Sequence, residues 1–175
     1  MSNRTRQLCY SAILAAMTAV LGYTSIDLGN LKVTFESLPI LLGAILFGPV
    51  EGLLIGGVGT FIYQMLRYGV SATTLLWMLP YIVAGFMMGY YSKHREFRLS
   101  AKQILIMTFA CEIVITAINT VAMYIDSKIY GYYSFAYIFG SLGVRSAVCI
   151  GRAIVFGLLL PSLVKACRAT LVPAR

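Results

Sequence analysis

The sequence predicts an all-α integral membrane protein, a single domain of residues 1–175 with six transmembrane helices and both termini in the cytoplasm. Three observations support this prediction: an apolar composition, long stretches with little charge, and basic residues confined to three clusters. Of the 175 residues, 59% are hydrophobic and only 11% are charged, whereas soluble domains carry about 25% charged residues. A soluble domain of this length has too small an interior to bury so much apolar surface, so we expect the bilayer to cover it.

Six stretches with few or no charges supply the expected helices, because crossing a bilayer takes about 20 apolar residues. The expected helices span residues 8–26, 37–50, 51–67, 72–92, 103–125 and 143–164. Glu112 is the only charge within the fifth, and Arg145 and Arg152 are the only charges within the sixth. The first apolar run exceeds the apolar core of a signal peptide and lacks a clear cleavage site, so we expect it to be retained.

The second expected helix is too short to be assigned from its length. Its uncharged stretch, Ser37–Val50, has 14 residues and could cross the membrane, dip into it or lie in a core. The basic residues decide, because Lys and Arg concentrate on the cytoplasmic side of a membrane. They cluster at residues 4–6, 93–102 and 165–175. A cytoplasmic N-terminus and a cytoplasmic 93–102 loop require an even number of crossings between them. The short segment is therefore predicted to cross and to turn tightly at its Gly-Pro end.

Polar side chains inside the last two helices give the strongest functional signal, because such groups are costly in a bilayer and usually functional. Glu112 and Asn119 lie seven residues apart on one helix face, and Arg145 and Arg152 repeat that spacing on the next helix. Since these helices run antiparallel, Glu112 and Arg152 are expected near the midplane, either as a structural ion pair or as part of a site. Asn119 and Arg145 are expected nearer the outer surface, where we favour a role in ligand binding.

Further candidates lie at the outer helix ends and in two outer loops. The loop 27–36 is expected to pack over a site, and the segment 130–139, "YGYYSFAYIF", is rich in tyrosines that mostly fit an interfacial aromatic belt. Aromatic faces can stack on a flat ligand, and arginines bind anionic groups. Outside the last two helices, the predicted substrate-binding residues are Lys32, Glu36, Tyr63, Gln64, Arg67, Tyr68 and Trp77.

The remaining chemistry is sparse and argues against several classes of protein. Most of the net charge of +8 comes from the three basic clusters, which anionic lipids explain better than nucleic acid does. The four cysteines have no paired spacing and the only histidine, His94, lies in a basic loop, so we expect neither a metal nor another cofactor. No phosphate-binding loop of the GxxxxGK[ST] type is present, so any ATP hydrolysis would need a partner.

Two sequence motifs are shared with one family of transporters. The first helix contains "SAILAAMTAVLGY", and small residues four apart in such a helix allow close contact with another helix. The second motif, "KVTFESLPILLGAILFGPVEGLLIGGVG", is close to the pattern F..LP..L.G.LFGP..G...G..G. With its size and cytoplasmic termini, the chain resembles the substrate-binding subunits of bacterial energy-coupling factor vitamin transporters, and most resembles the folate branch.

That resemblance implies a multi-pass protein of the bacterial cell membrane that binds a vitamin on the outside and is not an enzyme. It also implies docking through the first helix onto a membrane coupling subunit that works with two ATPases. The docking residues expected in this helix are Ala12, Ala15, Ala16 and Ala19. Folate is the favoured ligand, with riboflavin, pantothenate or another vitamin as alternatives.

A membrane enzyme that acts on a lipid is the competing hypothesis. Such an enzyme should carry paired carboxylates or a lysine–histidine set near the cytoplasmic leaflet. In this sequence Glu112 is the only carboxylate within the last two expected helices, and the polar residues gather toward the outside. The pattern therefore favours binding over catalysis.

Overall fold

The structure, a computed structural model, describes residues 3–28, 31–140 and 142–171. Along this part of the chain lie α1 Asn3–Tyr23, β1 Ile26–Leu28, β2 Leu31–Val33, α2 Ser37–Phe47, α3 Pro49–Tyr68, α4 Thr74–His94, α5 Ala101–Ile129, α6 Phe135–Phe139 and α7 Leu142–Leu171. The predicted helical architecture is confirmed. One detail differs, because the expected loop after the first helix contains an antiparallel hairpin in which Ile26 pairs with Val33.

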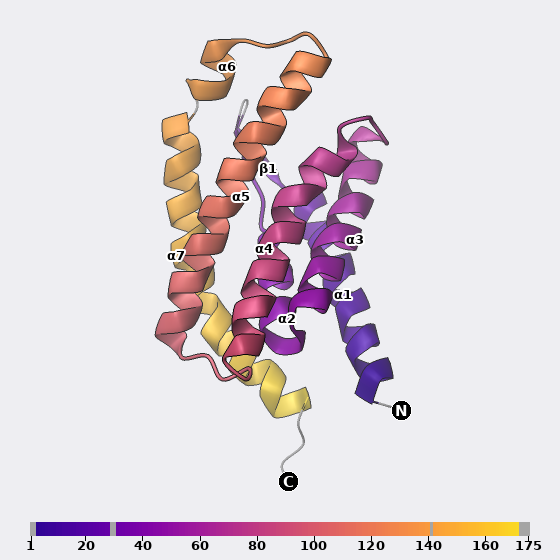
Figure 1. Ribbon diagram of the computed structural model, residues 1–175, viewed down its shortest axis with the longest axis vertical. Coiled ribbons are helices and arrows are strands. Elements are labelled where there is room, and N and C mark those ends of the chain that lie inside the picture. The colour runs from indigo at the N-terminus through magenta and orange to yellow at the C-terminus, as the bar shows by residue number, and fades with distance from the viewer. Residues whose placement is uncertain (1–2, 29–30, 141, 172–175) are drawn as a thin grey trace.

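The helices form an elongated bundle. Figure 1 shows α5 and α7 side by side at one edge, α1 and α3 at the other, α2 and α4 between them, and α6 across one end. In the described part of the chain, three segments are long and apolar enough to cross a membrane: α4, α5, and Phe135–Ala169, which contains α6 and most of α7. The helix α2 is apolar but shorter than these segments.

The three basic clusters of the sequence lie at the same end of the bundle. In Figure 1 the first turn of α1, the α4–α5 connection and the last turns of α7 are together at the end opposite α6. Residues 4–6, 93–102 and 165–168 belong to these places. We call this end of the bundle the basic end and the opposite one the α6 end.

The turn between α2 and α3 consists of a single glycine. Gly48 has a φ of 105°, a conformation that side-chain-bearing residues rarely adopt, and it ends α2 at Phe47, three residues before the expected end. Pro49 then begins α3. Proline suits the first position of a helix because its missing N–H has no intrahelical acceptor there.

The helix α5 is longer than the sequence suggested. A capping box fixes its start: the Ser100 hydroxyl accepts from the Gln103 N–H at 3.3 Å, and the Gln103 side chain accepts from the Ser100 N–H at 2.9 Å. Its 29 residues continue beyond the expected end at residue 125. Asp126 consequently lies on the same helix as Glu112.

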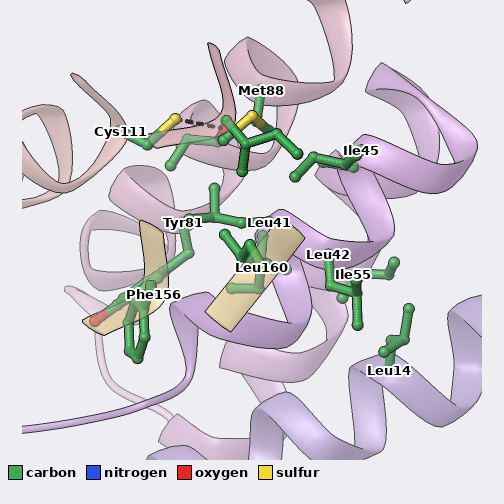
Figure 2. Packing of buried hydrophobic residues seen from close by; sticks show 14 of the residues in the cluster. Leu14, Leu41, Leu42, Ile45, Ile55, Tyr81, Met88, Cys111, Phe156 and Leu160 are labelled. Atoms are coloured by element: carbon green, nitrogen blue, oxygen red, sulfur yellow. Dashed lines mark hydrogen bonds between the residues drawn. The ribbon is translucent and has the colours of Figure 1, made fainter. Parts of the chain in front are cut away.

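The core surrounds the short helix α2. Leu41 and Ile45 of α2 are fully buried, and Figure 2 shows them among Ile55 of α3, Met88 of α4 and Leu160 of α7. A helix that is apolar on all sides is expected to be enclosed by others. The absence of charge in this segment therefore reflects its central position as well as the membrane.

Glycines bring α3 and α4 into close contact. A Cβ on Gly85 would lie 2.3 Å from the carbonyl oxygen of Gly52, and one on Gly52 would lie 2.4 Å from the carbonyl oxygen of Gly85. A Cβ on Gly56 would lie 2.6 Å from the carbonyl oxygen of Tyr81. Small residues allow helix backbones to approach in this way, which maximises dispersion contacts in lipid.

We expect Gly85→Ala to destabilise the protein by about 1–3 kcal/mol, because the new methyl group collides with backbone that cannot move aside. The measurement is the melting temperature of the purified protein in detergent. Gly57→Ala is the matched control, since its Cβ would meet only the Ile82 side chain at 3.5 Å. Equal melting temperatures for the two variants would contradict the close contact.

Candidate ligand-binding site

A cavity of about 540 Å³ lies in the half of the bundle toward the α6 end. It is lined by Thr34, Glu36, Tyr63, Gln64, Tyr68, Ser71, Thr73, Trp77, Tyr81, Thr116, Asn119, Met123, Asp126, Tyr130, Tyr132, Tyr137, Arg145, Val148, Cys149 and Arg152. Seven of these side chains are aromatic and four are charged, two with each sign. A cavity with this volume and lining suits a small organic ligand that is held by stacking and by a few polar contacts.

A buried ion pair lies at the inner end of the cavity, where Arg152 is the member that lines it. Arg152 of α7 donates through Nη2 to Oε2 of Glu112 on α5, and it donates through Nη1 to the carbonyl oxygen and the hydroxyl of Thr34, both at 3.3 Å. Ser37, in the first turn of α2, donates to Oε1 of Glu112 at 2.6 Å. The pair thereby joins α5, α7, α2 and the segment that follows the hairpin.

Glu36 is a second buried carboxylate beside this pair. It has 1% of its surface exposed, and its Oε1 accepts a hydrogen bond from the Tyr81 hydroxyl of α4. The side chain lies close against α1, since a Cβ on Gly22 would be 2.8 Å from Glu36 Oε2. The cavity therefore has an acceptor, Glu36, and a donor, Arg152, at its inner end.

The rim of the cavity is closed by hydrogen bonds to Asp126. Trp77 of α4 donates its indole N–H to Oδ1 at 3.4 Å, and the Tyr132 hydroxyl donates to Oδ2. Partial burial, together with the hydrogen bond to Asp126, raises the pKa of Tyr132 above its ordinary value. Through the carboxylate of Asp126, the Tyr132 hydroxyl links the α5–α6 connection to Trp77 of α4.

Two other arginines differ in what they contact. Arg145 lines the cavity, and its Nη1 lies 3.5 Å from the sulfur of Met123. Among the described residues, no carboxylate forms an ion pair with Arg145. Arg67 instead donates to the carbonyl oxygen of Tyr23 at 2.9 Å and to the Ser25 hydroxyl at 3.0 Å, so it ties α3 to the end of α1.

Eight of the predicted substrate-binding residues line the cavity: Glu36, Tyr63, Gln64, Tyr68, Trp77, Asn119, Arg145 and Arg152. Glu112 does not line it, because its carboxylate lies behind Arg152 as the partner in the ion pair. Arg67 does not line it either, because its guanidinium is engaged at the end of α1. The side chain of Lys32 lies outside the described residues.

Several lining residues were not expected from the sequence. Most tyrosines of the 130–139 segment were expected to form an interfacial belt, and the segment was also expected to cover a pocket; Tyr130, Tyr132 and Tyr137 line the cavity. The sequence did not indicate that Tyr81 lines the cavity, because this residue lies in an apolar stretch of α4. Asp126 could have been predicted from the sequence as a lining residue, because it continues the seven-residue spacing of Glu112 and Asn119 along α5.

The alanines of α1 belong to two different faces of the helix. Ala15 and Ala19 are each 6% exposed and pack within the bundle, and a Cβ on Gly59 of α3 would lie 2.8 Å from the Ala15 carbonyl oxygen. Ala12 and Ala16 are exposed. The expected docking face therefore needs correction: only Ala12 and Ala16 lie on a free surface of this chain.

The donor set of the cavity suits binding by stacking, hydrogen bonds and ion pairs. Within the described part of the chain, His, Cys, Asp and Glu side chains form no group that could hold a metal ion. The four cysteines are free thiols.

A helical bundle with long apolar helices and a polar, aromatic cavity defines a membrane-embedded binding protein. The family model described as "ECF transporter, substrate-specific component" matches residues 6–173, and the chain belongs to this family. The chain is accordingly an integral membrane transport component and not an enzyme. A search of curated proteins found no match.

Three solved structures share the fold. The S-component for biotin from an ECF-type ABC transporter has a TM-score of 0.68 at 18% identity, covering 94% of this chain and 95% of that one. FolT bound with folic acid has a TM-score of 0.65 at 19% identity, covering 86% and 89%. ThiT from Listeria monocytogenes has a TM-score of 0.70 at 22% identity, covering 98% and 100%.

We expect Glu112→Gln to lower the free energy of unfolding by about 3–5 kcal/mol, because it leaves the buried charge of Arg152 without its counter-ion. The readout is the melting temperature in detergent without ligand. Glu96→Gln, which makes the same change at an exposed position of the basic end, should have almost no effect. A similar melting temperature for both variants would show that the ion pair contributes little.

Proposed function

We propose that the chain binds a vitamin at the outer face of the bacterial cytoplasmic membrane and presents it to an importer driven by two ATPases. The helices α1, α2, α3, α4, α5 and α7 supply six crossings, with both termini inside. This topology is supported by the three basic clusters at one end of the bundle, since Lys and Arg concentrate on the cytoplasmic side. The cavity then lies in the outer half.

One observation carries the proposal for the ligand: seven aromatic side chains share a cavity with Arg145, a half-buried cation that has no carboxylate partner among the described residues. A flat ring with an anionic group complements both features. The cavity volume of about 540 Å³ is adequate for a molecule of this size.

Folate is the favoured candidate. Its pterin ring could stack on the aromatic side chains and pair its polar edge with Glu36, Gln64 and Asn119, while the glutamate tail contacts Arg145. Riboflavin would use the same aromatic residues but would leave Arg145 without an anion. Pantothenate would supply an anion but no ring, and the similar structures include components for biotin as well as folate, so these ligands belong in the same binding assay.

Docking onto the coupling subunit is proposed to use the exposed face of α1. Ala12 and Ala16 are one turn apart on that face, and the exposed apolar side chains of Ile13, Met17 and Val20 flank them. Small residues surrounded by larger apolar ones allow a second helix to approach in a bilayer.

We expect Arg145→Ala to weaken folate binding by roughly ten- to a hundredfold, because a charge-assisted contact contributes about 1.5–3 kcal/mol. Pteroate, which lacks the glutamate, should lose much less. The measurement is equilibrium binding to the purified protein in detergent. Arg98→Ala, at the exposed basic end, is the matched control and should leave both affinities unchanged. Equal losses for folate and pteroate would place Arg145 away from the tail, and no folate binding by the unaltered protein would end the folate assignment.

We expect Ala16→Trp to abolish vitamin uptake by the assembled transporter while the isolated subunit keeps its ligand affinity, because the large ring separates the docking helices. Ala15→Trp should behave differently, since Ala15 packs inside the bundle and its replacement should also lower the melting temperature. Uptake assays in cells and binding assays in detergent separate the two effects. Normal uptake with Ala16→Trp would exclude this face as the docking surface.

A further inference from the structure

One buried donor of the cavity wall has no acceptor within the described part of the chain. The Nε of Arg152 is fully buried and makes no hydrogen bond there, although Arg152 lines the cavity. A buried N–H without a partner costs about 1–3 kcal/mol. Since Arg152 lies at the inner end of a cavity built for a ligand, a ligand atom is the natural acceptor.

The other two nitrogens of the guanidinium are already engaged. Nη2 donates to Glu112, and Nη1 donates to two oxygens of Thr34. Glu112 is itself fixed by the Ser37 hydroxyl at 2.6 Å. The guanidinium plane is therefore held from α5 and from the segment preceding α2, and among its three nitrogens Nε alone has no acceptor within the described part of the chain.

We propose that Arg152 donates its Nε–H to an uncharged acceptor of the ligand, a ring nitrogen or a carbonyl oxygen, while Arg145 binds an acid group farther out. This inference rests on the proposed vitamin-binding function and narrows the ligand class. The two arginines are seven residues apart on α7, which separates them by about 10 Å along the helix axis. The ligand is thus an elongated molecule with a neutral polar head and an acid at the opposite end.

The division of roles follows from charge compensation. Glu112 already neutralises Arg152 through the contact between its Oε2 and Nη2, so the charge of Arg152 is compensated within the protein. A second carboxylate at this position would also meet the charges of Glu112 and Glu36 across a buried environment. Arg145 has no such counter-ion among the described residues, so the acid group is accommodated there.

The test compares acids with their neutral relatives on variants of each arginine. The probes are folate and pterin, biotin and biotinamide, and pantothenate and panthenol, with thiamine and riboflavin as vitamins that lack a carboxylate. The variants are Arg152→Lys, which keeps the charge opposite Glu112 but removes the Nε donor, and Arg145→Ala. Arg98→Ala is the control at the basic end. Binding is measured on the full chain purified in detergent.

We expect one acid to bind tightly and its neutral relative to bind more weakly. Arg152→Lys should weaken the acid and its neutral relative by the same factor, roughly ten- to a hundredfold. Arg145→Ala should weaken only the acid. Melting temperatures measured without ligand identify a variant that fails to fold.

A second variant keeps the proposal testable if Arg152→Lys does not fold. Ser37 does not line the cavity and reaches Arg152 only through Glu112. Ser37→Ala should therefore cause a smaller loss that is again equal for the acid and its neutral relative. A purely structural role for Ser37 would lower the melting temperature without changing either affinity.

Three results would overturn the inference. Unchanged affinities in folded Arg152→Lys would make Arg152 a structural residue only. A loss confined to the acid in that variant would mean that Arg152 binds the carboxylate. Binding of thiamine or riboflavin alone would agree with a vitamin-binding function but would contradict the inference that the ligand carries an acid group. Binding of no vitamin in the panel would reject the proposed function as well.

Discussion

The ion pair between Glu112 and Arg152 is the interaction on which the half of the bundle toward the α6 end depends. A charged side chain at the centre of a membrane helix costs about 2.5–3.5 kcal/mol on insertion scales, so each member of the pair requires the other. Because Arg152 also donates to Thr34 and Glu112 accepts from Ser37, the complete network forms only when α5, α7 and the start of α2 are together. Its formation therefore positions the inner end of the cavity.

A gradient of side-chain size along α3 and α4 explains where the cavity lies. At steps of four residues, one face of α4 carries Gly89, Gly85, Tyr81 and Trp77, in order from the basic end toward the α6 end. The facing stripe of α3 changes in the same direction, from the glycines at 52 and 56 to Thr60 and Gln64. Glycines bring the two backbones into contact in the basic half. Toward the α6 end the same stripes carry larger or polar side chains, and Gln64, Tyr81 and Trp77 among them line the cavity.

The sequence predicted those parts of the site that depend on helix periodicity and charge. Glu112 and Arg152 were expected at the same depth because they lie on antiparallel helices, and the ion pair confirms that expectation. Spacing did not predict how each helix is rotated about its axis, because tertiary packing decides it. For this reason Arg67 was placed in the site although it contacts the end of α1, and Ala15 was placed on a free surface although it packs against α3.

Toward the α6 end, local sequence patterns failed to predict the structure for a different reason. The hairpin is only three residues long in each strand, too short for an alternating pattern to be recognised. Tyr81 looks like a core residue from its neighbours, and only the approach of Glu36 from another element turns its hydroxyl into part of a polar network. The tyrosines after α5 fit an interfacial belt equally well, and their position at the cavity depends on how the α5–α6 connection folds back.

The core and the cavity lining consequently share few residues, Tyr81 being one that belongs to both. The glycine contacts and the apolar core around α2 stabilise the basic half and the centre of the bundle, and none of the core aliphatic side chains lines the cavity. Residues such as Gln64, Asn119 and Arg145 line the cavity without belonging to that core, so other side chains at these positions would leave the helix packing intact. A fold organised in this way can keep its helix arrangement while the outer residues change. The TM-scores of 0.65–0.70 with proteins 18–22% identical in sequence show that this helix arrangement is shared at low identity.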